Sequence, residues 1–273
     1  MVKKVFGIIK FIIAIIFSWL INVAFVKDKK SGRLDVKKFL SKKVNYIVDK
    51  NFINDIKIFG GIEETSKNKI DILISNHNST IDFLILIKLM YKFNIKDYYF
   101  IFKESISKIP ILGSCMIDDI KLKRKWEDDK DYIIKQLNEI EKGLIIIYPE
   151  GTRFDNKKYK ESKLFCKNNN LPILNYTLTP RIKGTHLIIT ELKKTNRLGN
   201  IYDVTLTFDN FIKKELYLTK ILKINNLGPV TIDIKKIKFN ETDFDYEELK
   251  KKIYKVWLKK NILIDNIYKK NVS

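Results

Sequence analysis

Two short apolar runs, residues 70–74 and 144–148, do most to restrict the fold of this chain. Each has the length of a β-strand, and each leads directly into a polar turn. Helical and extended patterns alternate around them: helices are expected at 83–90, at 128–142 and from 246 onward, and further strands at 98–102, 172–178, 201–208 and 229–239. Strands that are apolar along their length are typical of a sheet covered on both faces. The sequence therefore predicts an α/β fold with a mixed, largely parallel sheet covered by helices on both faces.

Capping residues indicate where two of these helices end and begin. Gly143 follows the second helical pattern and is expected to stop it. Asp245 is expected to cap the C-terminal helix, which places Leu249, Ile253 and Trp257 on one apolar face.

The turn after the first strand holds His77 and then Asp82. Asn78, Ser79 and Thr80 are good helix caps, so Asp82 is expected in the first helical turn, where its carboxylate can fold back towards the imidazole. A histidine oriented by a carboxylate is a general base. A surface histidine beside a capping aspartate gives the same pattern, and the pair alone leaves both interpretations open.

The turn after the second strand contains Glu150, Gly151, Thr152 and Arg153. Because parallel strands end at one edge of a sheet, this turn is expected beside His77. Gly151 allows a tight turn whose N–H groups can approach a ligand, Thr152 supplies a hydroxyl, and Arg153 offers a planar guanidinium that suits phosphate. These residues predict a phosphate-binding turn, although a Glu-Gly turn with an exposed arginine fits the pattern as well.

A third polar stretch begins at Lys103, after the expected strand 98–102, and continues into a strongly basic run at 121–125. Its lysines either bind phosphate groups or are simply solvated.

Residues 5–26 are almost continuously apolar and long enough to cross the hydrocarbon layer as a helix. We expect a retained membrane helix rather than a cleaved signal peptide, with a core helix as the alternative. The lysines that follow favour a cytoplasmic main domain. Residues 36–48 have the spacing of an amphipathic helix, which lies either on an anionic membrane or on the domain. The expected division is a membrane anchor with this basic helix, 1–55, and an α/β domain, 56–273.

The formal net charge of +21 predicts attraction to an anionic partner: nucleic acid, an acidic membrane or a phosphorylated substrate. Lysine is abundant throughout the chain, so the charge does not choose among these partners. Cys115 and Cys166 lack metal-ligand spacing, and reduced thiols in an intracellular setting are expected.

Asn76-His77 with Asp82, followed by Glu150-Gly151-Thr152-Arg153, resembles the motif pair of the glycerolipid acyltransferases, the 1-acylglycerol-3-phosphate acyltransferase superfamily. Residues 124–129, 171–184 and 201–205 are similar to its eukaryotic branch of lysophosphatidic acid and lysocardiolipin acyltransferases. Thr185 departs from the resemblance, because an aromatic residue is usual there.

This resemblance implies a membrane-bound, acyl-CoA-dependent O-acyltransferase that acts on a lysophospholipid at an anionic intracellular membrane resembling the endoplasmic reticulum. The acceptor it implies is 1-acyl-sn-glycerol-3-phosphate, with lysocardiolipin or another lysophospholipid as the alternative. Acyl-CoA is then a co-substrate, and neither a metal, another cofactor nor a nucleic-acid partner is expected.

The resemblance also implies residue roles. His77 and Asp82 form the general base pair, and the implied substrate-binding residues are Asn76, Lys103, Glu150, Gly151, Thr152 and Arg153. Arg153 is expected to hold the acceptor phosphate, and Glu150 to orient Arg153 or bind acceptor hydroxyls. Backbone N–H groups near Asn78 are expected to stabilise the oxyanion.

Three other classes of protein share some of these features. A nucleic-acid-binding protein would explain the charge but should carry a recognisable binding motif. A metal hydrolase could use His77 and Asp82, but the other histidine, His186, is far away in the sequence. A catalytically inactive lipid-binding protein would share the fold and the charge, and only the intact motifs argue against it.

Overall fold

The computed structural model describes residues 42, 44–46, 48, 53, 55–63, 66–107, 119–123, 125–221, 223–224 and 226–272. The strands are β1 (Ile56–Phe59), β2 (Ile70–Ser75), β3 (Tyr98–Lys103), β4 (Ile120–Leu122), β5 (Gly143–Ile147), β6 (Leu198–Phe208) and β7 (Val230–Ile237). The helices are α3 (Asp82–Lys92), α4 (Glu104–Ser107), α6 (Trp126–Glu139), α7 (Asn156–Asn168), α8 (Ile182–Lys194), α9 (Leu218–Ile221) and α10 (Tyr246–Val272), with short 3₁₀ turns η1 (Asp209–Phe211) and η2 (Glu241–Phe244).

The strands form one seven-stranded sheet in the order β1-β7-β6-β2-β5-β3-β4. From β6 to β4 every neighbouring pair is parallel, whereas β7 runs antiparallel to β6 and parallel to β1. The predicted mixed, largely parallel sheet is therefore confirmed.

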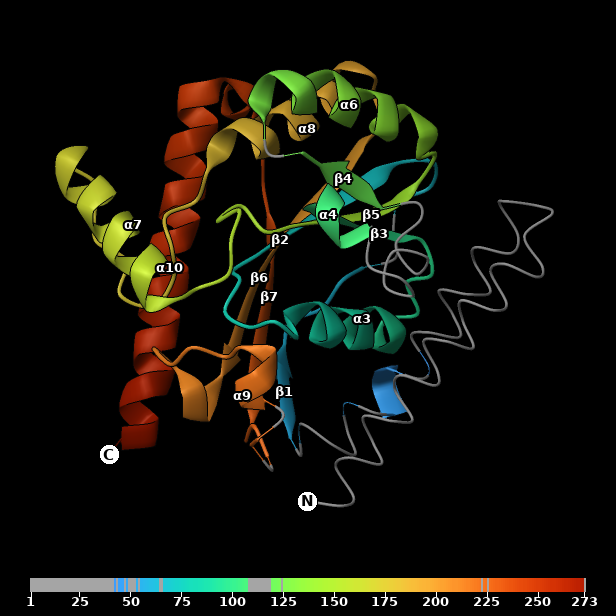
Figure 1. The fold of residues 1–273 in the computed structure, drawn as a ribbon. Helices are drawn as coiled ribbons and strands as arrows, with labels where there is room; N and C mark the ends of the chain where they lie inside the picture. Colours follow the sequence, from blue (N-terminus) through green and yellow to red (C-terminus); the bar gives the residue numbers. More distant parts are fainter. Residues whose placement is uncertain are drawn as a thin grey trace.

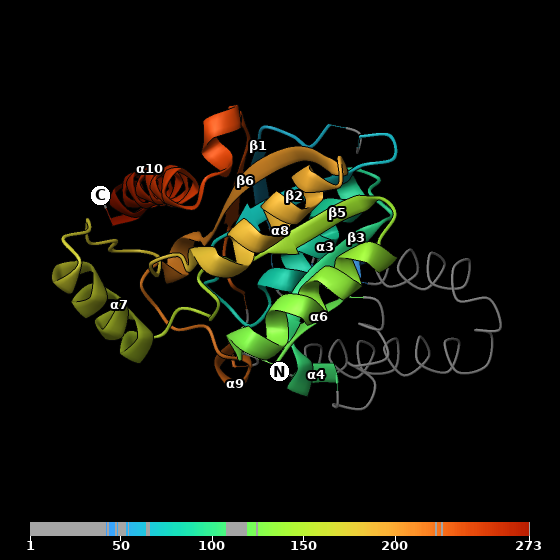
Figure 2. The ribbon, with the colours of Figure 1, turned by 90° about the horizontal axis from the view of Figure 1, so that it is seen from above.

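Helices cover both faces of the sheet, as Figures 1 and 2 show: α3 lies on one face, and α6, α8 and α10 lie on the other. Strand β2 contributes to both cores because successive side chains of a strand point to opposite faces. Leu73 packs in the core with α3, and Ile72 and Ile74 pack in the core with the other three helices. The central strands β2 and β5 are buried along their whole length.

The expected strand at 172–178 is wrong, because this segment has irregular backbone between α7 and α8. Leu174 is buried and Asn175 is exposed, but Tyr176 and the next two residues are all buried, so the segment does not alternate as a half-buried strand would. The hydrogen-bond partner is a helix: the Asn175 and Tyr176 N–H groups donate to Asn261 Oδ1 of α10, at 2.7 and 3.1 Å. A short apolar run in the sequence cannot by itself distinguish this arrangement from a strand.

The end of the expected helix 128–142 differs from expectation. Helix α6 ends at Glu139, and Gly143 is the first residue of β5 rather than a helix stop. Gly143 has φ +128°, and a Cβ there would lie 2.5 Å from the Asp97 carbonyl oxygen, so the close approach to β3 requires glycine. Helices α7 and α8 and strands β1 and β4 were not predicted.

The expected membrane span at 5–26 lies outside the described residues. Among the residues that the structure describes, no helix has the length and apolar content needed to cross a membrane. For 36–48, the described residues favour packing on the domain. Val44 and Val48 are buried in the core that includes α3, and Lys88 of α3 donates to Asn45 Oδ1 at 2.6 Å.

Candidate active site

The turn between β2 and α3 places His77 beside Asp82. His77 Nδ1 lies 2.9 Å from Asp82 Oδ2, as the sequence predicted for this pair. The Asp82 side chain is fully buried, whereas 25% of the His77 side chain is exposed. Because Nδ1 faces the carboxylate, Nε2 is the ring nitrogen that remains for a substrate.

Asp82 also holds the backbone of the turn. Its Oδ2 accepts the N–H groups of Asn78, at 2.6 Å, and Ser79, at 2.9 Å, while the Thr80 N–H donates to the Leu216 carbonyl at 3.1 Å. Asn78, Ser79 and Thr80 were expected to cap the helix with their side chains. Instead, Asp82 in the first helical turn accepts the backbone N–H groups of Asn78 and Ser79. The expected oxyanion site at this helix start is wrong, because these N–H groups already have acceptors within the protein.

Tyr148, which follows β5, stacks on the imidazole. The two ring centroids are 4.3 Å apart and the ring planes are inclined by 22°. Burial and the negative charge of Asp82 raise the pKa of Tyr148 well above its ordinary value, so its hydroxyl stays neutral. Sequence reasoning missed this residue, although an aromatic side chain directly before the second turn was a visible signal.

Arg153 lies against the His77 turn. Its Nη1 donates to Thr80 Oγ1 at 2.6 Å, and its guanidinium lies over the Tyr217 ring, 4.5 Å from the centroid. The Phe154 N–H donates to the His77 carbonyl at 2.7 Å. The two polar turns therefore meet at one edge of the sheet, and Tyr217 is a further neighbour that the sequence did not reveal.

Gly151 presents exposed backbone next to these side chains, with φ +66°. A Cβ at Gly151 would lie 3.4 Å from Arg181 Cδ, so the stem of Arg181 runs directly beside the glycine. The Arg181 N–H donates to the Pro149 carbonyl at 2.7 Å, and its side chain is exposed. With half-buried Thr152 and Arg153, this part of the site suits a phosphate group.

Comparison with known proteins shows what this part of the chain is similar to. The family model described as Acyltransferase matches residues 58–191, which include both turns. This match supports the resemblance to the glycerolipid acyltransferase superfamily. The matched residues include His77, Asp82 and Arg153, which meet at one edge of the sheet.

Named relatives are similar to part of this chain. The probable 1-acyl-sn-glycerol-3-phosphate acyltransferase 5 of Arabidopsis thaliana is 32% identical over 164 residues, which is 57% of this chain and 43% of the plant protein. Human 1-acyl-sn-glycerol-3-phosphate acyltransferase gamma is 32% identical over 144 residues, 50% of this chain and 38% of the human protein. The matched region thus spans less than half the length of these relatives.

A solved structure agrees over nearly the whole chain. The crystal structure of the 1-acyl-sn-glycerophosphate (LPA) acyltransferase PlsC from Thermotoga maritima covers 94% of this chain and 96% of its own, with a TM-score of 0.52 and 16% sequence identity. At that identity the likeness is one of fold.

Two residues of the matched region lie deeper than the sequence suggested. Asn76 is fully buried and pairs with the Leu206 backbone of β6: its Nδ2 donates to the carbonyl at 2.8 Å, and its Oδ1 accepts the N–H at 2.9 Å. Glu150 is 1% exposed. Neither side chain offers surface to a substrate, so the expected substrate-binding positions are corrected to positions that support the turns.

Burial raises the pKa of Glu150 to about 8, against the hydrogen bonds from Trp257, Leu178 and His77 and the positive charge of Lys260. Glu150 Oε1 accepts the Trp257 indole N–H at 3.3 Å and the His77 backbone N–H at 3.4 Å. The carboxyl group therefore lies behind the His77 turn.

The lysines of the third polar stretch lie farther along the sheet. Lys103 is exposed at the end of β3, which is separated from β2 by β5. Lys123 and Lys125 follow β4, one strand beyond. Strands are spaced by about 4.8 Å, so β3 and β4 lie about 10 and 14 Å from β2. A lysine side chain covers part of this distance, so Lys103 stays a predicted phosphate-binding residue.

Proposed function

We propose that the protein is an acyl-CoA-dependent O-acyltransferase that transfers a fatty acyl chain to the free hydroxyl of a lysophospholipid. The acceptor we propose is 1-acyl-sn-glycerol-3-phosphate, which gives phosphatidic acid, and the names of the matched relatives support this choice. The observation that carries the proposal is the partly exposed His77, paired with buried Asp82 and adjacent to the turn that holds Arg153.

In this reaction His77 Nε2 accepts the proton of the acceptor hydroxyl as its oxygen attacks the thioester carbonyl of acyl-CoA. Asp82 fixes the imidazole and stabilises its protonated form. The tetrahedral intermediate then collapses, the C–S bond breaks, and the thiolate takes the proton from His77. The products are a new ester and free CoA.

The acceptor is positioned by its phosphate. Thr80 and Tyr217 hold the Arg153 guanidinium, which limits the entropy lost when it binds an anion. The exposed Gly151 backbone, Thr152 and Arg181 complete the proposed phosphate-binding surface. Holding the acceptor in this way can remove several kcal/mol, on the order of 7–11 at most, from the barrier of a bimolecular reaction.

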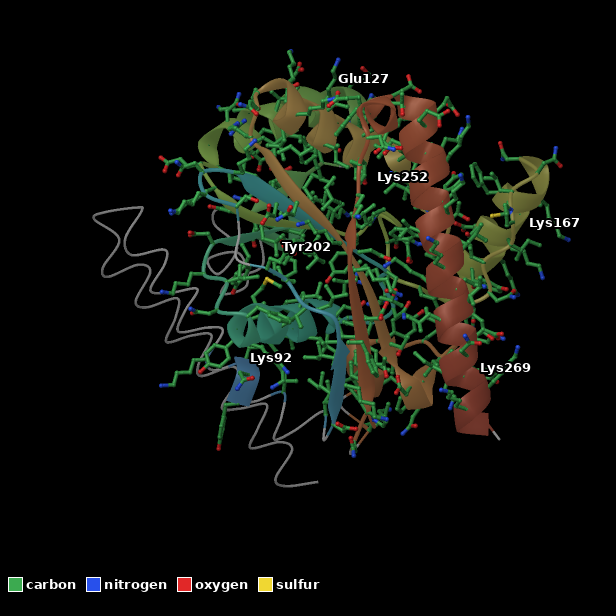
Figure 3. The ribbon with its side chains drawn as sticks, turned by 180° about the vertical axis from the view of Figure 1, so that it is seen from behind. Lys92, Glu127, Lys167, Tyr202, Lys252 and Lys269 are labelled. Atoms are coloured by element: carbon green, nitrogen blue, oxygen red, sulfur yellow. The ribbon has the colours of Figure 1, made fainter. Side chains whose placement is uncertain are left out.

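We further propose that the protein works at an anionic intracellular membrane, with residues 5–26 and the net charge of +21 contributing to its attachment. Figure 3 shows the side chains of Lys92, Lys167 and Lys269 at separate places on the outside of the domain. Because the positive charge is spread over the molecule, it supports general attraction to acidic lipid rather than one docking patch.

The experiment is a turnover assay with the purified full chain, a panel of lysophospholipids and a panel of acyl-CoAs. His77→Ala should abolish acyl transfer, and Asp82→Asn should lower kcat by about 10²–10⁴ because the imidazole loses its anionic partner. The matched control is His186→Ala, since His186 lies in α8 and contacts the Phe244 backbone and the Tyr246 ring.

An active His77→Ala enzyme would reject this mechanism. A strong preference for lysocardiolipin or another lysophospholipid would replace the acceptor but keep the chemistry. Binding to anionic vesicles without turnover of any pair would favour a non-catalytic lipid-binding protein.

A further inference from the structure

Helix α10 reaches the candidate active site from the far end of the chain. Trp257 is fully buried, and its indole N–H donates to Glu150 Oε1 at 3.3 Å. The same oxygen accepts the backbone N–H of His77 at 3.4 Å. One carboxyl oxygen thus joins α10 to the backbone of the proposed catalytic histidine.

Lys260, one helical turn after Trp257, is also buried, with 1% of its surface exposed. Its ammonium group forms an ion pair with Asp203 and donates to the Val204 carbonyl at 2.6 Å. Asp203 and Val204 lie in β6 opposite Ile74 and Ser75, at the end of β2. Lys260 therefore fixes α10 next to the strand that leads into the His77 turn.

Burying an ion pair between a helix and a sheet has a high desolvation cost. Removing a lysine ammonium from water costs several kcal/mol, and apolar side chains of the same volume often give equal or greater stability. What the ion pair supplies is position: residues three apart lie on the same helix face, so fixing Lys260 also fixes Trp257. The positive charge of Lys260 acts on Glu150 as well, because it opposes the effect of burial on that carboxyl group.

We propose that Trp257 and Lys260 are positioning residues of the acyl-transfer site that act through Glu150. They hold the Glu150 carboxyl group behind the turn, and Glu150 in turn fixes the backbone at His77, so that the imidazole faces both Asp82 and the acceptor hydroxyl. This inference rests on the proposed function for its kinetic readout. It gives the glutamate of the second turn a role without substrate contact.

The contacts of Glu150 define which variants distinguish a positioning role from direct contact with the substrate. Both N–H groups donate to one oxygen of Glu150, and a glutamine keeps a carbonyl oxygen at that position. With its pKa raised to about 8, the Glu150 side chain is mostly protonated at neutral pH, so glutamine also matches its charge. Glu150→Gln should therefore keep the support of His77, whereas Glu150→Ala removes it.

The kinetic test compares these variants in steady-state assays with both substrates. Glu150→Gln should keep kcat within about threefold of the unaltered protein, Glu150→Ala should lower kcat by about 100-fold, and Trp257→Phe should lower it by about tenfold, with each KM within about twofold. The Glu150→Ala and Trp257→Phe losses should not add, because both remove the same support. Lys260→Met should behave like Trp257→Phe.

Matched controls come from the same chain. Trp126→Phe alters a tryptophan at the start of α6, and Lys252→Met removes an α10 lysine that pairs with Asp243. Both should leave kcat unchanged. Circular dichroism and thermal unfolding of every variant separate loss of folded protein from loss of turnover.

A second readout does not depend on activity. His77 and His186 are the two histidines of the chain, so ¹⁵N-histidine NMR gives two sets of ring signals, which His186→Ala assigns. Trp257→Phe and Glu150→Ala should shift or broaden the His77 ring signals and leave those of His186 in place. This readout decides the inference even if the protein transfers no acyl group.

Three results would overturn the inference. Glu150→Gln could be as inactive as Glu150→Ala with a raised acceptor KM, which would mean that Glu150 contacts substrate as a carboxylate. Trp257→Phe could lower thermal stability while the folded protein kept its full kcat. The His77 signals could stay unchanged in both variants.

Discussion

The side chains of Asp82 and Arg153 are both held in place by several contacts within the site. Asp82 Oδ2 faces the imidazole and also accepts two backbone N–H groups of the turn, so the group that orients the base also shapes the loop that carries it. Arg153 is held by a hydroxyl and an aromatic ring, and it remains partly exposed. Preorganised polar groups of this kind are typical of sites that bind charged ligands.

At this scale the prediction concerns Arg153. Arg153→Ala should raise the KM of the lysophospholipid by about 10–100-fold and change kcat by less than about threefold, because a phosphate held equally in ground and transition states contributes uniform binding. Steady-state kinetics with each substrate varied in turn measures both constants.

Arg181→Ala is the companion variant. If the acceptor KM stays constant in Arg153→Ala while the acyl-CoA KM rises, Arg153 belongs on the donor side of the site. The same comparison for Arg181 shows which of the two phosphate-bearing substrates meets the exposed face of Gly151.

At the scale of elements, α10 acts as a partner for irregular backbone as well as for the sheet. Asn261 Oδ1 receives the N–H groups of Asn175 and Tyr176, and Asp265 accepts the Tyr176 hydroxyl. These contacts hold the segment between α7 and α8, which leads to Arg181.

Asn261→Ala should lower the free energy of unfolding by about 1–2 kcal/mol, because two N–H groups lose one acceptor and one of them belongs to a buried residue. Urea unfolding followed by circular dichroism measures the change. Asn261→Asp keeps the acceptor oxygen and should restore most of the loss. A stability unchanged in the alanine variant would show that water replaces the amide.

The two polar turns were predictable because each is a local pattern: an apolar strand is followed, within a few residues, by side chains of recognisable chemistry. His77 and Asp82 are close in sequence, and Arg153 could be placed near them from the rule that parallel strands end at one edge. The burial of Glu150 was not predictable, since it depends on Trp257, 107 residues away in the sequence. Segment 172–178 is a short apolar run like a strand, and nothing local shows that its hydrogen-bond partner is a helix.

At the scale of the whole molecule, burial links the site to the pH dependence of stability. The pKa of Glu150 is about 8 in the folded protein and 4.5 ordinarily, so between these values the unfolded chain releases a proton that the folded chain keeps. The positive charge of Lys260, whose partner is Asp203, acts on Glu150 against this effect of burial.

A carboxyl group whose pKa is raised by folding stabilises the folded state least at high pH. Glu150 should therefore make the free energy of unfolding fall as the pH rises from about 5 to 8. Glu150→Gln should remove this contribution and flatten the profile. Urea unfolding at several pH values, with Lys252→Met as the control, measures the difference. Equal slopes for Glu150→Gln and the unaltered protein would show that Glu150 has an ordinary pKa.

The contacts of α10 also set an order of events during synthesis. The ribosome releases His77, Asp82 and Arg153 long before it releases Trp257 and Lys260, so a nascent chain carries the reactive groups without the helix that supports Glu150. Turnover should therefore begin only after α10 has been synthesised. A stalled translation product that ends before α10 should transfer no acyl group even when both substrates are present.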